Sequence, residues 1–244
     1  MDWSDEAVVL AARRHGEGHA VLDCLTRGHG RARGYVRGAH GRALRGVLEP
    51  GNEVMVTWRA RLETQLGHFQ VELKTARAGQ LLADKVALAT LSAATTLMAL
   101  AMPEREALPG AYHALLALMD LLAADVLPEA AAAGLVQVEL GLLAALGYGL
   151  DLSRCAATGA TDDLIYVSPK SARAVSASAG APYADKLLPL PGFLLGRQAG
   201  PVTAQTARQG LALTGYFLDR WVLAPTMKTL PPDRQRLLEL LDRD

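Results

Sequence analysis

Apolar and polar residues alternate along the first eighty residues in short runs, as they do in β-strands. The runs are rich in valine or aromatic residues and are separated by the turn sequences HGEG, RGHG and EPGN. They cover residues 6–14, 19–27, 31–38, 52–63 and 68–76. Five short strands in so few residues predict a small closed or partly open barrel, for which an OB-fold and an SH3-like barrel are the two alternatives.

After Gly79 the spacing of apolar residues becomes helical. Alanine and leucine dominate residues 80–146, with apolar side chains three and four positions apart. Proline is poorly tolerated inside a helix, so this region should divide into about three helices at Pro103, Pro109 and Pro128.

The rest of the chain combines an irregular region with further helices. Residues 163–200 carry Ser, Gly and Pro throughout, which predicts loops. Residues 203–223 again show helical spacing, and Pro231 and Pro232 begin a last short helix.

These patterns predict an α+β protein in four segments. The barrel should occupy residues 1–80 and a helical domain residues 81–150. Residues 151–200 should form an irregular insert, and the helices of residues 201–244 should complete the helical domain.

One segment has nearly the composition of a membrane span. Residues 86–103 carry no charge and have about the minimum length, but Thr90, Ser92, Thr95 and Thr96 interrupt them, which favours a packed core helix. The first residues, MDWSDE, are acidic where a signal peptide is basic. We therefore expect a cytoplasmic protein with no membrane partner.

Positive charge is concentrated in one stretch although the chain has no net charge. Residues 26–46 hold six arginines, two histidines and no acidic residue. Within it, Arg31, Arg33, Tyr35 and Arg37 occupy every second position, so a strand places them on one face and turns Ala32, Gly34 and Val36 into the barrel. Such a row of guanidiniums should repel itself unless a polyanion lies across it.

Phosphates spaced along a nucleic acid satisfy that requirement, and Tyr35 offers a ring on which a base can stack. The candidate DNA-binding residues are Arg13, Arg14, Arg31, Arg33, Tyr35, Arg37, Arg42 and Arg45. Three alternatives stay open: a merely solvated arginine-rich face, binding of structured RNA, and an adaptor that docks an acidic protein.

No pattern in the chain points to catalysis. There is no G-x-x-x-x-G-K-[ST] loop and no G-x-S-x-G elbow, so neither ATP hydrolysis nor serine hydrolase chemistry is indicated. His15 and His19 are four positions apart, but Gly16 and Gly18 make this a turn rather than a helical metal site. We expect neither an enzyme nor a cofactor.

Taken in order, several of these sequences resemble the RecO family of bacterial recombination mediators and strand-annealing DNA repair proteins. They are GEG after the first strand, the G-R-x-R-G-x-x-R-G run, the L-E-P-G-N turn, the Ala/Leu-rich middle and LGYGLDLSRC near residue 150. The resemblance covers nearly the whole chain.

The resemblance implies an N-terminal OB-fold and a helical domain. It also implies a nucleoid-associated protein that binds single- and double-stranded DNA and anneals complementary strands. Its partners would be RecR, with which it helps to load RecA, and single-stranded DNA-binding protein. The acidic, phenylalanine-ended tail of the latter would bind the helical domain.

The insert departs from the family pattern. Many members carry a zinc-binding module here, and Cys155 should begin a C-x-x-C pair, but position 158 is Thr158. Ser168 and Ser171 stand where we would expect later cysteines. A structural zinc site needs about four N or S ligands. The insert is therefore a degenerate zinc-finger-like region that should hold its shape without metal, with Cys155 as a small buried hydrophobe.

Overall fold

The computed structural model describes residues 1–62, 64–196 and 200–242. The chain forms two compact units, Met1–Asp125 with Pro231–Arg234, and Val126–Leu230 with Gln235–Asp244. The four segments expected from the sequence rest on composition rather than on contacts, and they stay a proposal. The parts of those segments at residues 63, 197–199 and 243–244 lie outside the described residues.

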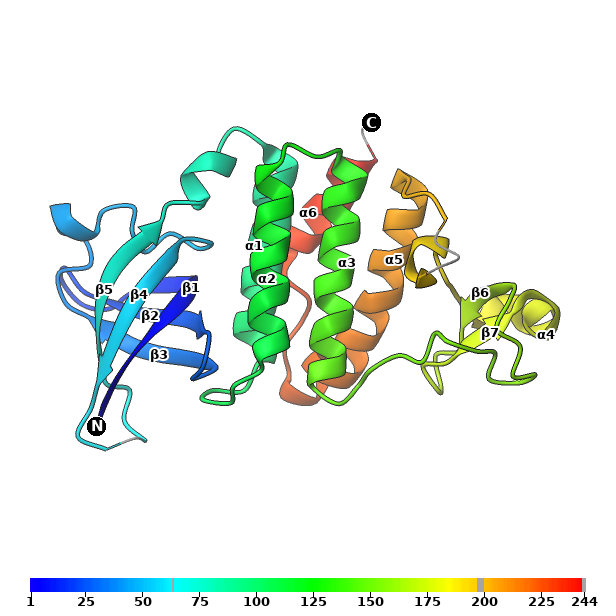
Figure 1. The fold of residues 1–244 in the computed structure, drawn as a ribbon, viewed down its shortest axis with the longest axis horizontal. Helices are drawn as coiled ribbons and strands as arrows, with labels where there is room; N and C mark the ends of the chain where they lie inside the picture. Colours follow the sequence, from blue (N-terminus) through cyan, green and yellow to red (C-terminus); the bar gives the residue numbers. More distant parts are fainter. Residues whose placement is uncertain (63, 197–199, 243–244) are drawn as a thin grey trace. The chain divides into compact units, whose positions relative to one another are not determined.

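Five strands form a closed barrel at the start of the first unit (Figure 1). They are β1 (Asp2–Arg14), β2 (Ala20–Thr26), β3 (Arg31–Val36), β4 (Glu53–Arg59) and β5 (His68–Thr75). Their order around the barrel is β1-β2-β3-β5-β4, and β4 pairs with β1 to complete the circle. This arrangement is an OB-fold, so the first of the two predicted barrels is confirmed.

All five strands lie where the alternation of apolar residues predicts them. The largest differences are at β1 and β4. Strand β1 begins at Asp2 instead of residue 6, because Asp2–Val8 pairs with the whole of β4, and β4 ends at Arg59 instead of residue 63. The β3–β5 closure is brief. It consists of the parallel pair Tyr35–His68 and a hydrogen bond of 3.0 Å from the Tyr35 N–H to the carbonyl oxygen of Gly67.

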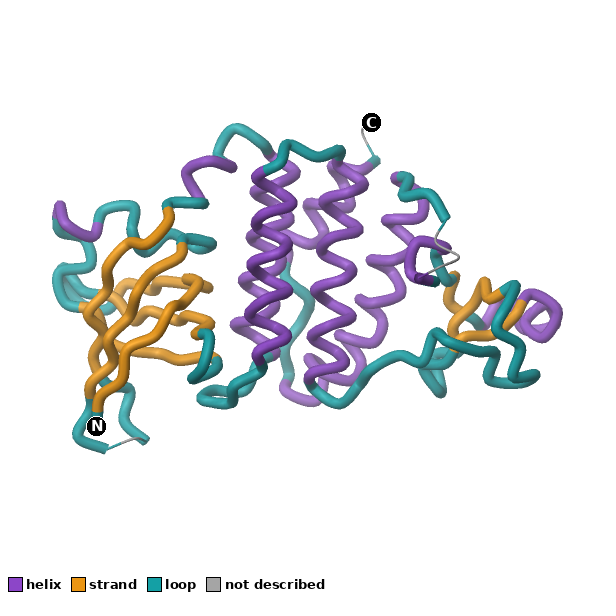
Figure 2. The backbone as a smooth tube through the Cα atoms, in the orientation of Figure 1, coloured by secondary structure: helices purple, strands orange, loops and turns teal. Residues whose placement is uncertain are grey.

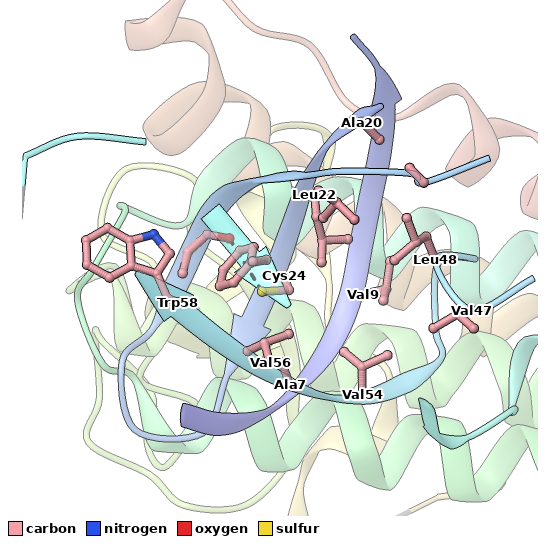
Figure 3. Close-up of a cluster of buried hydrophobic side chains, with 14 residues drawn as sticks. Ala7, Val9, Ala20, Leu22, Cys24, Val47, Leu48, Val54, Val56 and Trp58 are labelled. Carbon is pink, nitrogen blue, oxygen red and sulfur yellow. Dashed lines mark hydrogen bonds between the residues drawn. The ribbon is translucent and has the colours of Figure 1, made fainter. Parts of the chain in front are cut away.

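The barrel interior is filled by alternate residues of the strands and by three residues of the β3–β4 connection (Figure 3). Gly34 is required here, since a Cβ at this position would lie 2.4 Å from the Phe69 ring. Burial raises the pKa of the Cys24 thiol inside this core. The interior consists of Ala7, Val9, Ala20, Leu22, Cys24, Ala32, Val36, Ala39, Val47, Leu48, Val54, Val56, Trp58 and Phe69.

The connection from β3 to β4 carries three of the candidate arginines and is fastened at its end by Asn52. The Asn52 side-chain N–H groups donate to the carbonyl oxygens of Gly46 and Val47 at 2.7 and 3.2 Å, and its Oδ1 accepts from the Ala78 N–H at 3.0 Å. Gly51 adopts φ +90°. The L-E-P-G-N turn thereby holds the arginine-bearing connection against the barrel.

Two helices follow the barrel within the first unit, α1 (Lys85–Ala101) and α2 (Pro109–Ala123). Asp84 caps α1, accepting hydrogen bonds from the N–H groups of Val86 and Ala87. Pro109 opens α2, in agreement with the predicted division at this proline. In the described part of the chain, every helix is too short or too polar to cross a membrane.

The second unit contains α3 (Pro128–Ala145) and α5 (Ala204–Phe217), which pack against each other. Pro128 opens α3, and a Thr203–Thr206 capping box opens α5. Beyond α5 the chain widens into a π-helical turn over Leu218–Leu223. The last helix, α6 (Pro232–Leu241), begins at the predicted proline pair.

The insert is more regular than its composition predicts. It contains a three-stranded sheet of β6 (Leu164–Val167), β7 (Ala174–Ser176) and β8 (Leu188–Pro189), in the order β7-β6-β8 (Figure 2). Short helical turns, among them α4 (Ala177–Gly180), lie between β7 and β8 and after β8. The expectation of loops over residues 163–200 was therefore wrong in part. Strands of two to four residues are too short to show an alternation that can be recognised.

Cys155 is buried, and its sulfur is held by hydrogen bonds. Sγ accepts from the Ser176 N–H at 3.3 Å and from the Ser176 hydroxyl at 3.4 Å. Ser176, rather than Ser168 or Ser171, is thus the serine that lies beside the sulfur. Among the described residues, no group of three or more His, Cys, Asp or Glu side chains is arranged to hold a metal ion. That the insert is stable without zinc stays a prediction.

These hydrogen bonds change the acidity of Cys155. Desolvation by itself raises the pKa of the thiol, but hydrogen bonds from Ser176 and Thr158 lower it to about 6. They satisfy the buried sulfur. The expected small buried hydrophobe is therefore also a hydrogen-bonded, acidic thiol.

We predict that Cys155 makes the protein more stable as the pH rises from about 6 to about 9. The native pKa lies below the ordinary value of 9.0, so the unfolded chain binds more protons in this range, and the contribution is lost as the pH falls through 6. The Tm difference between wild type and Cys155→Ser should widen by several degrees with pH. Cys24→Ser is the control, because its raised pKa keeps that thiol protonated. Parallel curves for wild type and Cys155→Ser would contradict the prediction.

Candidate nucleic-acid interface

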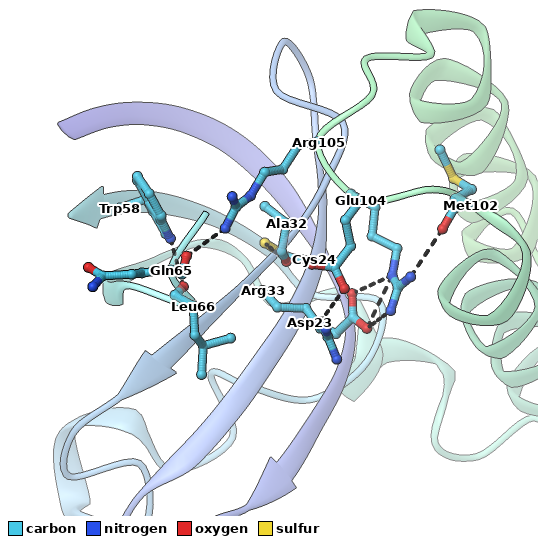
Figure 4. A network of polar contacts seen from close by, with 11 residues as sticks. Asp23, Cys24, Ala32, Arg33, Trp58, Gln65, Leu66, Met102, Glu104 and Arg105 are labelled. Carbon is cyan, nitrogen blue, oxygen red and sulfur yellow. Dashed lines mark hydrogen bonds and ion pairs between the residues drawn. The ribbon is translucent and has the colours of Figure 1, made fainter. Parts of the chain in front are cut away.

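The segment between α1 and α2 runs beside β3 (Figure 4). The Arg105 N–H donates to the carbonyl oxygen of Arg31 at 2.8 Å, and Arg31 and Glu104 form a parallel bridge. Gly30 is needed for this approach, since a Cβ would lie 2.1 Å from the carbonyl oxygen of Glu106. A part of the chain distant in sequence thus contributes side chains to the barrel surface.

Arg31 is held by groups of the protein itself. Its side chain is 13% exposed, and its Nε and Nη2 donate to the Asp23 carboxylate at 2.9 and 2.6 Å. Its Nη1 donates to the carbonyl oxygen of Met102 at 3.0 Å. A phosphate would have to displace Asp23 to reach this guanidinium. Arg31 therefore ties β3 to β2 and to the segment after α1.

Arg33 also has an acidic partner, but an accessible one. Its Nε lies 2.5 Å from Glu104 Oε1, and the two side chains are 43% and 32% exposed. An ion pair this exposed contributes about 1 kcal/mol at most, so a phosphate can replace the carboxylate at small cost.

The predicted alternation along β3 is confirmed, because Ala32, Gly34 and Val36 are buried while Arg33 is exposed. The predicted repulsion along the arginine row was wrong for its first two members, Arg31 and Arg33. Asp23 and Glu104, which neutralise them, both lie outside the acid-free stretch.

Tyr35 lies among three histidines at the end of β3. The centroids of His15, His19 and His68 are 5.6, 5.3 and 5.5 Å from that of Tyr35. The ring borders a groove of about 680 Å³ on the barrel surface. Charged and polar residues lining it include Arg37, Thr57, Arg59, His68, Gln70 and Glu72.

A second groove of about 730 Å³ brings together arginines that are distant in sequence. Arg14 comes from the end of β1, whereas Arg42 and Arg45 come from the β3–β4 connection, and all three are exposed. His40 also lines it, Glu49 is its acidic residue, and Ser92, Thr95 and Thr96 of α1 form its other side. Because Leu44 lines both grooves, they adjoin.

Within the described residues, Arg14, Arg37, Arg42 and Arg45 form no ion pair with an acidic side chain. Arg13 is likewise exposed but lies outside both grooves; it pairs with Val21, which pairs with Tyr35 on the next strand. The seven candidate arginines therefore fall into three groups. Four line the grooves without an acidic partner among the described residues, Arg13 is exposed outside the grooves, and Arg31 and Arg33 of β3 are paired with carboxylates.

Arg59, His68 and His40 also line the grooves, although they were not among the candidates predicted from the sequence. Arg59 and His68 flank the β4–β5 loop, and their proximity to Tyr35 depends on barrel closure, which no local pattern encodes.

Cations of the helical region are largely engaged: Arg105 donates to the carbonyl oxygen of Gln65, and Arg208 pairs with Asp242 at 2.5 Å.

The fold and these grooves define the class of protein, an OB-fold protein with a basic surface followed by helices. Comparison with known families agrees across the chain. The family described as Recombination protein O N terminal matches residues 1–77, and that described as Recombination protein O C terminal matches residues 82–231.

Two relatives of similar length carry the name of this family. The DNA repair protein RecO of Rhodospirillum rubrum is 50% identical over 245 aligned residues, which cover 100% of this chain and 97% of the relative. That of Caulobacter vibrioides strain NA1000 is 49% identical over 99% of this chain and 98% of its own length. The chain belongs to the RecO family, and this membership carries a role in DNA repair and recombination.

We predict that the Arg31–Asp23 pair is needed for stability. Replacing either partner alone, by Arg31→Met or Asp23→Leu, leaves a largely buried charge unpaired and should cost about 3 kcal/mol in urea denaturation. The double variant should cost less than the sum of the two. Glu104→Gln, which breaks the more exposed pair, should cost about 1 kcal/mol or less. Equal small losses in all variants would contradict this role for Arg31.

Proposed function

We propose that this chain is a recombination mediator that binds single- and double-stranded DNA through the exposed arginines of its barrel. The observation that supports this most is the groove lined by Arg14, Arg42 and Arg45. Three exposed guanidiniums from two separate segments, with one carboxylate among them, favour a ligand that carries several negative charges.

The shared boundary of the two grooves suggests the path of the DNA. A strand following the β3–β4 connection passes from Arg42 and Arg45 to Arg37, and then to Tyr35. The arginines would bind phosphates, and the Tyr35 ring would support a base. Arg33 joins this path if a phosphate replaces Glu104, whereas Arg31 contributes indirectly by holding β3 in place.

The mediator role includes partners beyond DNA. In this proposal the protein works with RecR, anneals complementary strands and helps to load RecA at the nucleoid. It would recognise DNA coated by single-stranded DNA-binding protein through the acidic tail of that protein, at an apolar pocket of the helical region. The role requires binding and annealing of strands rather than catalysis, and it needs no cofactor.

We expect Arg42→Glu combined with Arg45→Glu to weaken DNA binding at least tenfold at low salt, whatever the DNA sequence. If Arg14, Arg37, Arg42 and Arg45 each contact one phosphate, log K for single-stranded DNA should fall with log salt at a slope of roughly −3. Losing the two contacts of Arg42 and Arg45 should make the slope shallower, at roughly −1.4. Fluorescence anisotropy over a salt series measures both.

The matched control for this double variant is Arg154→Glu with Lys170→Glu, which changes the net charge equally at exposed positions of the insert. It should bind DNA like wild type. If the control and the groove variant lose affinity equally, net charge rather than the groove governs binding. Structured RNA competing as well as single-stranded DNA would favour an RNA ligand.

The mediator role predicts that the wild-type protein speeds annealing of complementary strands coated with single-stranded DNA-binding protein. A peptide of the acidic tail should inhibit this reaction, and the same peptide without its terminal phenylalanine should inhibit it less. Uncoated strands serve as the control, since their annealing needs no tail contact. Annealing of uncoated but not of coated strands would contradict the proposed recognition of the coating protein.

A further inference from the structure

Three rings and one guanidinium form a continuous stack at the β2–β3 turn end of the barrel. Trp58 and Trp3 lie 5.8 Å apart with planes 15° from parallel, and Trp3 and His29 lie 4.2 Å apart with planes at 7°. The Arg105 guanidinium lies over the Trp58 ring, 5.4 Å from its centroid. The order is therefore Arg105, Trp58, Trp3, His29.

Each inner layer of the stack is held in a fixed position. Trp3 and Trp58 are partners in the β1–β4 pairing, and the Trp58 Nε1–H donates to the carbonyl oxygen of Leu66 at 2.9 Å. Gly67 fits the loop against this ring, since a Cβ there would lie 2.4 Å from Trp58 Nε1. The Arg105 Nη2 donates to the carbonyl oxygen of Gln65 at 2.6 Å.

The outer ring, His29, is held in place by a hydrogen bond at its Nδ1, and this bond leaves the outer face of the ring uncovered. Its Nδ1 lies 3.0 Å from Asp5 Oδ2, which also accepts from the Gly28 N–H at 2.7 Å. Burial raises the pKa of Asp5, but these hydrogen bonds outweigh it and lower the pKa, so the carboxylate stays charged beside the imidazole. The turn therefore presents the His29 ring at a set angle.

His29 is the open end of this stack. Within the described chain its ring stacks on Trp3 alone, and its side chain keeps 43% exposure, whereas Trp58 is 3% exposed. A depression of about 460 Å³ adjoins the rings, lined by Met1, Asp2, Trp3, Gly28, His29, Ala32, Trp58 and Arg105. One more flat group can extend the stack at His29, where the ring is exposed.

We propose that His29 is the stacking platform for one unpaired nucleobase, a site separate from the arginine grooves. This inference rests on the proposed function, since it assumes that a DNA strand reaches the barrel. A flat base suits a single exposed ring face backed by two further rings. An ammonium group would instead need several exposed faces around it. Arg27 lies two residues away, with its side chain 62% exposed and its Nη1 3.9 Å from Glu6 Oε2. A pair this loose and exposed lets Arg27 meet the adjoining phosphate instead.

The platform lies at the opposite end of β3 from the arginine grooves. Strand β3 has six residues, so the two sites are roughly 20 Å apart along it. A DNA strand bound at both the platform and the arginine grooves would be held extended between them. Stacking depends little on base identity, so this site should distinguish unpaired from paired bases without preferring one base over another.

The test compares two probes with equal numbers of phosphates. One is an oligothymidylate, and the other has the same length with tetrahydrofuran spacers in place of the bases. Wild type should prefer the base-containing probe. His29→Gln, which can still hydrogen-bond to Asp5 but lacks a ring, should reduce that preference roughly five- to tenfold. His29→Phe, which keeps a ring without the hydrogen bond, should retain most of it.

A control variant separates this inference from the proposed function. Arg42→Glu with Arg45→Glu should weaken binding of both probes alike and leave their ratio unchanged. If His29→Gln keeps the wild-type ratio, the stack only closes the end of the barrel and the inference is wrong. If wild type binds neither probe, the proposed function itself fails and the platform fails with it.

Discussion

The Arg31 guanidinium connects three parts of the first unit that are separate in sequence. It pairs with Asp23 on β2 and hydrogen-bonds the carbonyl oxygen of Met102 after α1. Buried charge is stable only when it is paired and its donors are satisfied, so the two neighbours must keep their positions. The segment that brings Met102 also brings Glu104 to Arg33 and Arg105 to Trp58. The outer surface of β3 and the ring stack beside it both depend on this contact.

This arrangement divides the arginine-rich stretch by role. The arginines of β3 itself are balanced by carboxylates, so they stabilise the barrel without leaving a strongly repulsive surface. The arginines of the β3–β4 connection are exposed and, among the described residues, have no carboxylate partner. The connection is held instead by hydrogen bonds between the Asn52 side chain and backbone groups, so its position needs no ion pair. A polyanion therefore gains most by binding beside the connection, where no internal ion pair has to break.

In the insert, hydrogen bonds satisfy a buried sulfur. Ser176 and Thr158 supply them to Cys155. Hydrogen bonds to sulfur lower its pKa as a metal would, though less strongly. The small sheet of β6, β7 and β8 brings Ser176 to Cys155 across 21 positions of sequence, so its formation and the burial of the thiol are coupled.

The sequence alone determined the five barrel strands, the three helices opened or ended by prolines and the stretch of excess positive charge. These features depend on local periodicity and on the backbone limits of proline and glycine, which act over a few residues. Tertiary structure decided which arginines are free. Asp23 neutralises Arg31 from a neighbouring strand, and Glu104 reaches Arg33 from beyond α1. It also stacked Trp3, Trp58 and His29, which stand far apart in the sequence. Ion pairs and ring stacks depend on distances of a few ångströms between such residues, and only the closed barrel sets those distances.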